Sequence, residues 1–199
     1  MASLCARGQC EAMTEPTTPL ISPEPDVKDW TWVMSRRCPD CGLDAGAVEP
    51  QQVGERVRAD IGRWRSVLGR PDVRSRPSPA VWSPLEYAAH VRDVHRLFAA
   101  RLATILDCGA RGEVAALPNW DQDATAIADR YDLQDPCVVA KELEGSARAS
   151  AAAFDAIVPA QHDLRAVRSN GSEFTVRTLS QYYLHDVVHH LWDVDGARA

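Results

Sequence analysis

The stretch Ser83-Pro-Leu-Glu-Tyr-Ala-Ala-His-Val-Arg-Asp-Val-His-Arg-Leu-Phe-Ala-Ala-Arg-Leu-Ala-Thr-Ile-Leu-Asp107 determines how the rest of the chain is interpreted. Ser83 suits the N-cap of a helix, proline suits the first helical position, and Glu86 completes a capping box. Apolar side chains then recur at steps of three and four residues, as in an amphipathic helix. They are Tyr87, Val91, Val94, Phe98, Leu102 and Ile105. The sequence therefore predicts a long helix over about residues 83–107.

Three other segments carry the same helical periodicity, and each is bounded by glycine or proline. They predict helices over about residues 50–68, 136–157 and 178–194. A short helix is expected around residues 121–131, and Asn170-Gly171 predicts a turn that could join two short strands within residues 160–177. Four long helices connected by mostly polar segments indicate an all-α fold, a four-helix bundle.

The length of 199 residues suits one domain with a tail. Residues 1–28 are rich in proline, threonine, serine and glutamate, which predicts a disordered N-terminal tail before a bundle domain over residues 29–199. Residues 29–43 contain Trp30, Trp32 and the motif Cys38-Pro-Asp-Cys41-Gly, and are expected to form an ordered strap packed on the bundle. Met13 is an alternative start, in which case Cys5 and Cys10 would not belong to the protein.

The formal net charge of −6 argues against nucleic acid or an anionic membrane surface as the main partner. No apolar run approaches the roughly 20 residues that cross a bilayer. The first residues lack the apolar core of a signal peptide, so we expect a cytoplasmic protein whose six cysteines are mostly thiols.

Three of the six histidines lie in Tyr182-Tyr-Leu-His-Asp-Val-Val-His-His-Leu-Trp192. His185 and His189 are four residues apart, so on a helix their rings lie one turn apart on one face and could reach one metal ion. A packed or solvated histidine pair would have the same spacing. His90 borders an apolar face of the predicted helix over residues 83–107, and three histidines with an open position would resemble a catalytic zinc site. His190 is rotated by about 100° and is expected to point elsewhere.

Two other motifs need an interpretation. The segment His185-Asp-Val-Val-His189 is close to the H-E-x-x-H motif of zinc proteases, but we reject that interpretation because Asp186 is shorter than the glutamate that acts there as general base. The pair Cys38-x-x-Cys41 could be half of a zinc site, a redox pair or a structural turn. Because no second such pair exists, a structural turn or a labile disulfide is favoured over metal binding. His95 and His162 lack such a context and are expected at the surface.

Taken together, these motifs resemble the DinB-like superfamily. The resemblance rests on Trp82-Ser-Pro-Leu-Glu-Tyr-Ala-Ala-His-Val-Arg-Asp-Val94, on Phe174-Thr-Val-Arg-Thr-Leu-Ser180 and on His185-x-x-x-His189-His190, and it covers about residues 51–194. The superfamily includes mycothiol-dependent maleylpyruvate isomerases and thiol S-transferases. It implies a four-helix bundle whose metal is held by His90, His185 and His189. The strap with Cys38 and Cys41 is similar to a version found in actinobacterial members.

The resemblance also implies an activity. It suggests a metal-dependent S-transferase or thiol-dependent isomerase, with a zinc ion (or nickel) as cofactor, mycothiol as co-substrate and a small electrophile as partner. A homodimer is left open. Asp93 and Asp186 are candidates for outer hydrogen-bond partners of the ligands, although Asp93 is more typical of a solvated charge. The pocket mouth is expected to contain Trp120, Asp121, Asp123 and Arg177. The alternative is a metal-binding or stress-response protein without turnover.

Overall fold

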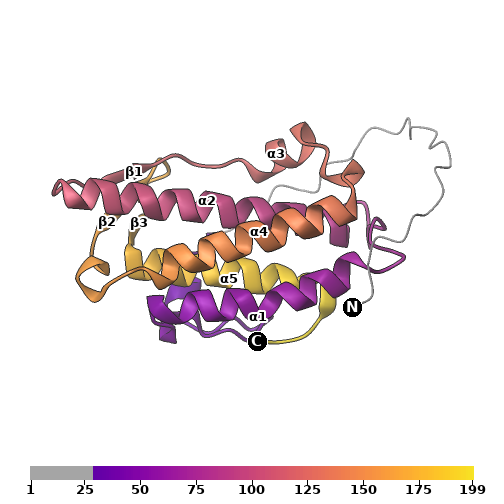
Figure 1. The fold of residues 1–199 in the computed structure, drawn as a ribbon, viewed down its shortest axis with the longest axis horizontal. Coiled ribbons are helices and arrows are strands. Elements are labelled where there is room, and N and C mark those ends of the chain that lie inside the picture. Colours follow the sequence, from indigo (N-terminus) through magenta and orange to yellow (C-terminus); the bar gives the residue numbers. More distant parts are fainter. Residues whose placement is uncertain (1–28) are drawn as a thin grey trace.

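Four long helices form the body of the protein in the computed structural model, which describes residues 29–199. The predicted tail, residues 1–28, lies outside the described residues. The helices are α1 (Pro50–Leu68), α2 (Pro84–Ala110), α4 (Pro136–Asp155) and α5 (Val176–Asp195), and they run along the long axis of the molecule (Figure 1). Both α1 and α2 pack mainly against α4 and α5, so the order around the bundle is α1, α4, α2, α5. The predicted four-helix bundle is confirmed.

The helix termini follow from local capping. At the start of α2 the Ser83 hydroxyl accepts a hydrogen bond from the Glu86 backbone N–H (3.3 Å), and the Glu86 carboxylate accepts one from the Ser83 N–H (2.8 Å). This is the predicted capping box. Helix α5 begins two residues earlier than expected because Thr175 is the N-cap and accepts from the Thr178 N–H (3.2 Å).

The core lies between the four helices and is filled by large apolar side chains. The fully buried ones include Phe98, Leu102, Leu143, Phe154 and Leu184. Helices α1 and α4 lie close together at Gly54, where a Cβ atom would be only 2.7 Å from the Ala151 carbonyl oxygen. Any larger residue there would force the two helices apart.

A small sheet covers one end of the bundle (Figure 1). It consists of β1 (Ala115–Leu117), β2 (Arg165–Arg168) and β3 (Glu173–Thr175). Strand β1 runs parallel to β2, with Ala115 opposite Ala166, and β2 is antiparallel to β3, with Ala166 opposite Phe174. The predicted turn at Asn170-Gly171 does connect two strands, whereas β1 was not predicted. The short helix α3 (Gln122–Ala128) lies within its predicted range.

Residues 29–49 form the strap, which precedes α1 and packs on α5. Its two 3-10 turns, Thr31–Met34 and Ala45–Ala47, both contact α5. The Gln181 side chain of α5 donates hydrogen bonds to the carbonyl oxygens of Gly46 (3.0 Å) and Val48 (3.2 Å). The strap therefore covers one face of the last helix.

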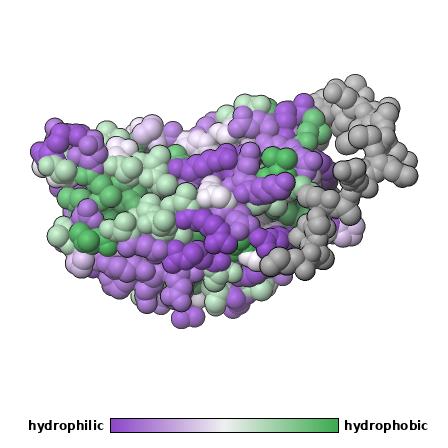
Figure 2. Space-filling view, in the orientation of Figure 1, coloured by the Kyte–Doolittle hydropathy of each residue, from purple (hydrophilic) through white to green (hydrophobic). Residues whose placement is uncertain are grey.

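The surface is mixed. Hydrophilic residues spread over much of the face in Figure 2, and hydrophobic areas lie toward the left, where Figure 1 places the sheet, and in a smaller area toward the right. Among residues 29–199, none of the helices has the length and apolar character that a membrane crossing requires.

Candidate metal centre

Helix α5 carries two pairs of potential metal ligands, offset from each other by one residue. His185 and His189 form one pair, and Asp186 and His190 form the other. Because one residue turns a helix by about 100°, the two pairs point in different directions. The first pair meets Cys38 and Cys41 of the strap, and the second meets His90 of α2. We call these the Cys–His cluster (Cys38, Cys41, His185, His189) and the His–Asp cluster (His90, Asp186, His190).

The structure thus divides the predicted triad between the two clusters. His90 shares a cluster with Asp186 and His190, whereas His185 and His189 belong to the other one. Within each cluster the ligand atoms lie within 4.8 Å of one another. The physical reason is that the strap occupies the face of α5 that carries the histidine pair. His190 does point away from that pair, as expected, and it points toward His90.

The His–Asp cluster contains buried polar atoms that have no hydrogen-bond partner in the part of the chain that the structure describes. His90 is fully buried. Its Nε2 lies 3.8 Å from Asp186 Oδ1, and His190 Nε2 lies 3.4 Å from the same oxygen. Within residues 29–199, neither ring nitrogen of His90 has a hydrogen-bond partner, and neither does Asp186 Oδ1. Leaving such atoms unsatisfied is costly, so their arrangement fits a bound cation.

Electrostatics favour the ligand forms of these side chains. Burial is the main reason why the pKa of His90 is lowered, which keeps the ring neutral and able to bind a metal. Burial opposes ionisation of Asp186, but contact with His90 and the charge of His190 hold the pKa of Asp186 below its usual value. His190 Nδ1 lies 2.9 Å from Asp193 Oδ2, which orients the opposite nitrogen toward Asp186. Carboxylates commonly hold metal-binding histidines in this way.

The Cys–His cluster is buried beneath the strap. Cys38 Sγ lies 3.6 Å from His189 Nδ1, and both cysteines are thiols rather than a disulfide. The Nε2 atom of His185 is buried without a hydrogen-bond partner among the described residues. Burial is the main cause that raises the pKa of Cys41 to about 12 and lowers that of His185 to about 4. The Trp30 ring lies over both imidazoles, with centroid distances of 5.6 Å to His185 and 5.1 Å to His189.

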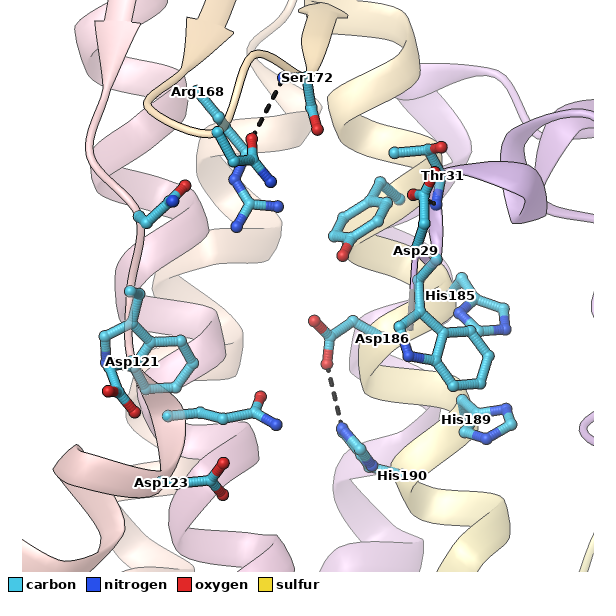
Figure 3. Close-up of a pocket in the computed structure, with 16 residues that line it drawn as sticks. Asp29, Thr31, Asp121, Asp123, Arg168, Ser172, His185, Asp186, His189 and His190 are labelled. Atoms are coloured by element: carbon cyan, nitrogen blue, oxygen red, sulfur yellow. Dashed lines mark hydrogen bonds and ion pairs between the residues drawn. The ribbon is translucent and has the colours of Figure 1, made fainter. Parts of the chain in front are cut away.

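A pocket of about 760 Å³ opens beside the clusters (Figure 3). In the figure, Asp186 and His190 from α5 face across it toward Asp121 and Asp123, and Arg168 lies at its upper end. The predicted mouth residues Trp120, Asp121 and Asp123 do line the pocket. The strap supplies another wall through Asp29, Trp30 and Thr31.

Arg177, the fourth predicted mouth residue, is not among the residues that line this pocket. It lies in the first turn of α5 and forms an ion pair with Glu49. Its guanidinium also contacts His162 Nδ1 (3.0 Å). The position of Arg177 along α5 explains why it lies away from the pocket. Arg177 precedes the ligand pairs by two turns and faces the start of α1.

Three further sequence expectations are wrong, because the two histidines are buried and all three side chains have partners. His95 Nδ1 lies 2.7 Å from the Tyr183 hydroxyl, and His162 Nε2 lies 2.8 Å from Gln51 Nε2, so neither histidine is a surface residue. Asp93 is no solvated charge, since it pairs with Arg92 (2.8 Å) and accepts a hydrogen bond from Tyr131 (2.6 Å). These residues stabilise packing away from the two clusters.

Comparisons with known proteins agree with this architecture. A family model described as the DinB superfamily matches residues 55–194. A similar solved structure is YfiT from Bacillus subtilis, described as a probable metal-dependent hydrolase with an unusual four-helix bundle topology. It is 16% identical, with a TM-score of 0.58, and the alignment covers 74% of this chain and 82% of YfiT. At this identity the likeness shows a shared fold. A search of curated proteins gave no match.

Proposed function

Because the chain belongs to the DinB superfamily, we propose that it is an enzyme that uses one divalent metal ion bound by the His–Asp cluster. The observation that carries the proposal is the position of this cluster. Among residues 29–199, some of its ligand atoms are buried and have no hydrogen-bond partner, and Asp186 and His190 line a pocket large enough for a small molecule. Three protein ligands beside a pocket leave a coordination position for substrate, as in catalytic metal sites.

The donor set fits the metal. Two neutral imidazoles and one carboxylate suit zinc, with nickel the second candidate. The hydrogen bond from His190 to Asp193 would fix the ring so that Nε2 faces the metal. His90 is held between the Trp82 and Trp120 rings, at centroid distances of 5.2 and 5.3 Å. The ligands are thus held in place by their surroundings, which lowers the cost of binding a cation.

The reaction that we propose is transfer of a low-molecular-weight thiol, mycothiol by the resemblance, to a small electrophile. A bound divalent metal lowers the pKa of a thiol and so supplies the nucleophilic thiolate. The pocket residues would bind and orient the two reactants. Arg168 lines the pocket, and its buried Nε has no hydrogen-bond partner among the described residues, so it is available to an anionic group of a substrate. Trp120 and Trp30 also line the pocket and offer flat aromatic surfaces to a substrate.

A second candidate is metal-dependent hydrolysis. It is favoured by the similarity to YfiT, which is described as a probable metal-dependent hydrolase. His90, Asp186 and His190 would hold the same metal, which would then lower the pKa of a water molecule instead of a thiol. The two reactions differ in one testable respect, because only the transfer consumes an added thiol.

The test combines metal analysis with an assay. Untagged protein is incubated with mycothiol and a panel of small electrophiles, and loss of free thiol is measured alongside product formation without thiol. We expect metal-dependent thiol consumption that is lost in His90→Ala. His162→Ala is the matched control, since it also removes a buried imidazole but lies outside both clusters.

The other possible results distinguish the alternatives. Product formation that needs no thiol would support hydrolysis. Full metal occupancy without turnover on any electrophile would support a non-catalytic metal-binding protein. An unchanged metal content in His90→Ala would overturn the assignment of the His–Asp cluster.

A further inference from the structure

We propose that the Cys–His cluster is a second metal site, in which Cys38, Cys41, His185 and His189 bind one structural zinc ion that fastens the strap to α5. This site is separate from the proposed catalytic cluster and does not depend on whether that cluster turns over substrate. It also gives a role to the Cys38-x-x-Cys41 motif, which the sequence alone left open.

The distances fit tetrahedral zinc. With bonds of about 2.0 Å to nitrogen and about 2.3 Å to sulfur, the corners of a zinc tetrahedron lie roughly 3.3–3.8 Å apart. Cys38 Sγ and His189 Nδ1 are 3.6 Å apart, within that range. All four ligand atoms lie within 4.8 Å of one another, so small side-chain movements would complete the tetrahedron. Two sulfur and two nitrogen donors in this geometry select zinc among the common divalent ions.

The charge balance fits a buried site. Zinc binding would release one proton from each thiol to solvent, and the two thiolates would then cancel the charge of the ion. The two imidazoles stay neutral, so the occupied site carries no net charge. This matters because the cysteines are at most 1% exposed and the two histidines at most 8%. A net charge at that depth would be costly.

The local backbone aims both thiols at the same point. In the turn after Cys38, the Gly42 N–H donates to the Cys38 carbonyl oxygen (3.1 Å) and the Cys38 N–H donates to the Leu43 carbonyl oxygen (2.9 Å). Gly42 has a φ of +80°, in the region that favours glycine. The chain thereby reverses tightly around Cys38-x-x-Cys41 and brings both sulfur atoms to the histidine pair.

An independent observation also points to a ligand. Among the described residues, His185 Nε2 is buried and has no hydrogen-bond partner. The Trp30 ring covers the two imidazoles, and Asp193 Oδ1 lies 3.8 Å from His189 Nε2, on the side of the ring away from Cys38. His185 and His189 also border the pocket, but four protein donors would fill the coordination shell of zinc. Zinc sites with four protein donors and no open position are structural rather than catalytic.

The test uses the full-length protein and two probes, zinc and cobalt. Zinc content is measured in untagged protein, and Co²⁺ is then exchanged in, because thiolate ligands give Co²⁺ a strong charge-transfer band in the near ultraviolet. We expect the band in the wild type. We also expect one metal equivalent less in the double variant Cys38→Ser/Cys41→Ser. The matched control is Cys108→Ser/Cys137→Ser, which removes two thiols outside the cluster and should keep both the band and the metal content.

The test of the Cys–His cluster can be distinguished from the test of the proposed catalysis. His90→Ala should lose the metal of the His–Asp cluster and keep the thiolate band, and this holds even if no enzyme activity exists. If the double variant does not fold, the cobalt spectrum of the wild type still decides. A wild type without that band, or with a disulfide between Cys38 and Cys41 in freshly isolated protein, would overturn the proposal.

Discussion

The two clusters on α5 differ in the number and type of their donors, although they lie one residue apart along the same helix. The Cys–His cluster has four donors, two of them sulfur, and lies under the strap. The His–Asp cluster has three donors, none of them sulfur, so a bound metal would keep a position for a further ligand. Both clusters border the pocket, through Asp186 and His190 in one and His185 and His189 in the other. The difference supports different roles for the two proposed sites. One helix can carry both a structural site with four protein ligands and an open site for catalysis, because a step of one residue redirects a ligand pair by about 100°.

The sharpest way to break this comparison is to remove the carboxylate of the open cluster. Asp186→Ala should lower kcat/KM by about 1000-fold, or about 4 kcal/mol, because it deletes a direct ligand and so exceeds the roughly 10–100-fold effect of outer partners. The melting temperature should change little, since Asp186 lines the pocket and its buried Oδ1 has no hydrogen bond to lose among the described residues. Steady-state kinetics and thermal unfolding of the same preparation test both parts. Asp163→Ala, an exposed acid outside both clusters, is the control. Activity within tenfold of the wild type would contradict the assignment.

The closed cluster should behave in the opposite way. Cys38→Ser should lower the free energy of unfolding by about 3 kcal/mol, which corresponds to a fall of roughly 6–12 °C in melting temperature for a protein of this size. The reason is that the strap loses its attachment to α5. We expect KM to rise as well, because Asp29, Trp30 and Thr31 of the strap line the pocket, whereas kcat should stay within a few-fold. Cys108→Ser should leave both quantities unchanged. A strap variant that lost kcat and kept its stability would reverse the two roles.

Most of the fold was predictable because it depends on local signals. Helical periodicity and capping residues such as Ser83 and Glu86 are properties of neighbouring residues, so they appear in the sequence. Strand β1 was missed for the opposite reason. It consists of three residues, and its pairing partner β2 lies about fifty residues further along the chain. Nothing local distinguishes such a segment from a loop.

The sequence predicts the types of residue at the site, but not how these residues divide into two clusters. Spacing correctly brought His185 and His189 together on one face of α5, and it could not say which element that face would meet. The sequence does contain a signal for this grouping in the Cys38-x-x-Cys41 motif, since its two thiols and the histidine pair together make a set of four metal ligands. Asp186 was noted only as an outer partner, although its spacing of four from His190 equals that of the histidine pair. Buried His95 was misjudged because its partner Tyr183 lies on another helix.

His95 provides a comparison for the histidines of the two clusters, because it is buried outside both of them and has hydrogen-bonding neighbours of its own. Burial lowers the pKa of His95 to about 3, against about 6.5 in the unfolded chain. Below pH 6.5 the unfolded state therefore takes up a proton that the native state refuses. Stability should be complete above that pH and fall by about 1.4 kcal/mol per unit as the pH decreases. Urea unfolding of wild type and His95→Gln between pH 7 and 4.5 measures the difference, and the variant should show the shallower dependence. Equal slopes would mean that His95 is protonated in the folded protein.

A change at Asp193 should alter metal affinity at one cluster and not at the other, although Asp193 lies near both. This is the smallest effect that we predict. Its Oδ2 is 2.9 Å from His190 Nδ1, whereas its Oδ1 is 3.8 Å from His189 Nε2, beyond hydrogen-bond distance. Asp193→Asn should therefore weaken metal binding at the His–Asp cluster by about 10–100-fold, as removal of an outer carboxylate does, and leave the Cys–His cluster nearly unaffected. Competition with a chelator of known affinity, followed by metal analysis and the cobalt thiolate band, measures the two sites separately. Asp195→Asn, at the same end of α5 but paired with Arg63, controls for changes at the helix terminus. Equal weakening at both sites would show that the clusters share one electrostatic environment, and the division between an open and a closed site would then no longer hold.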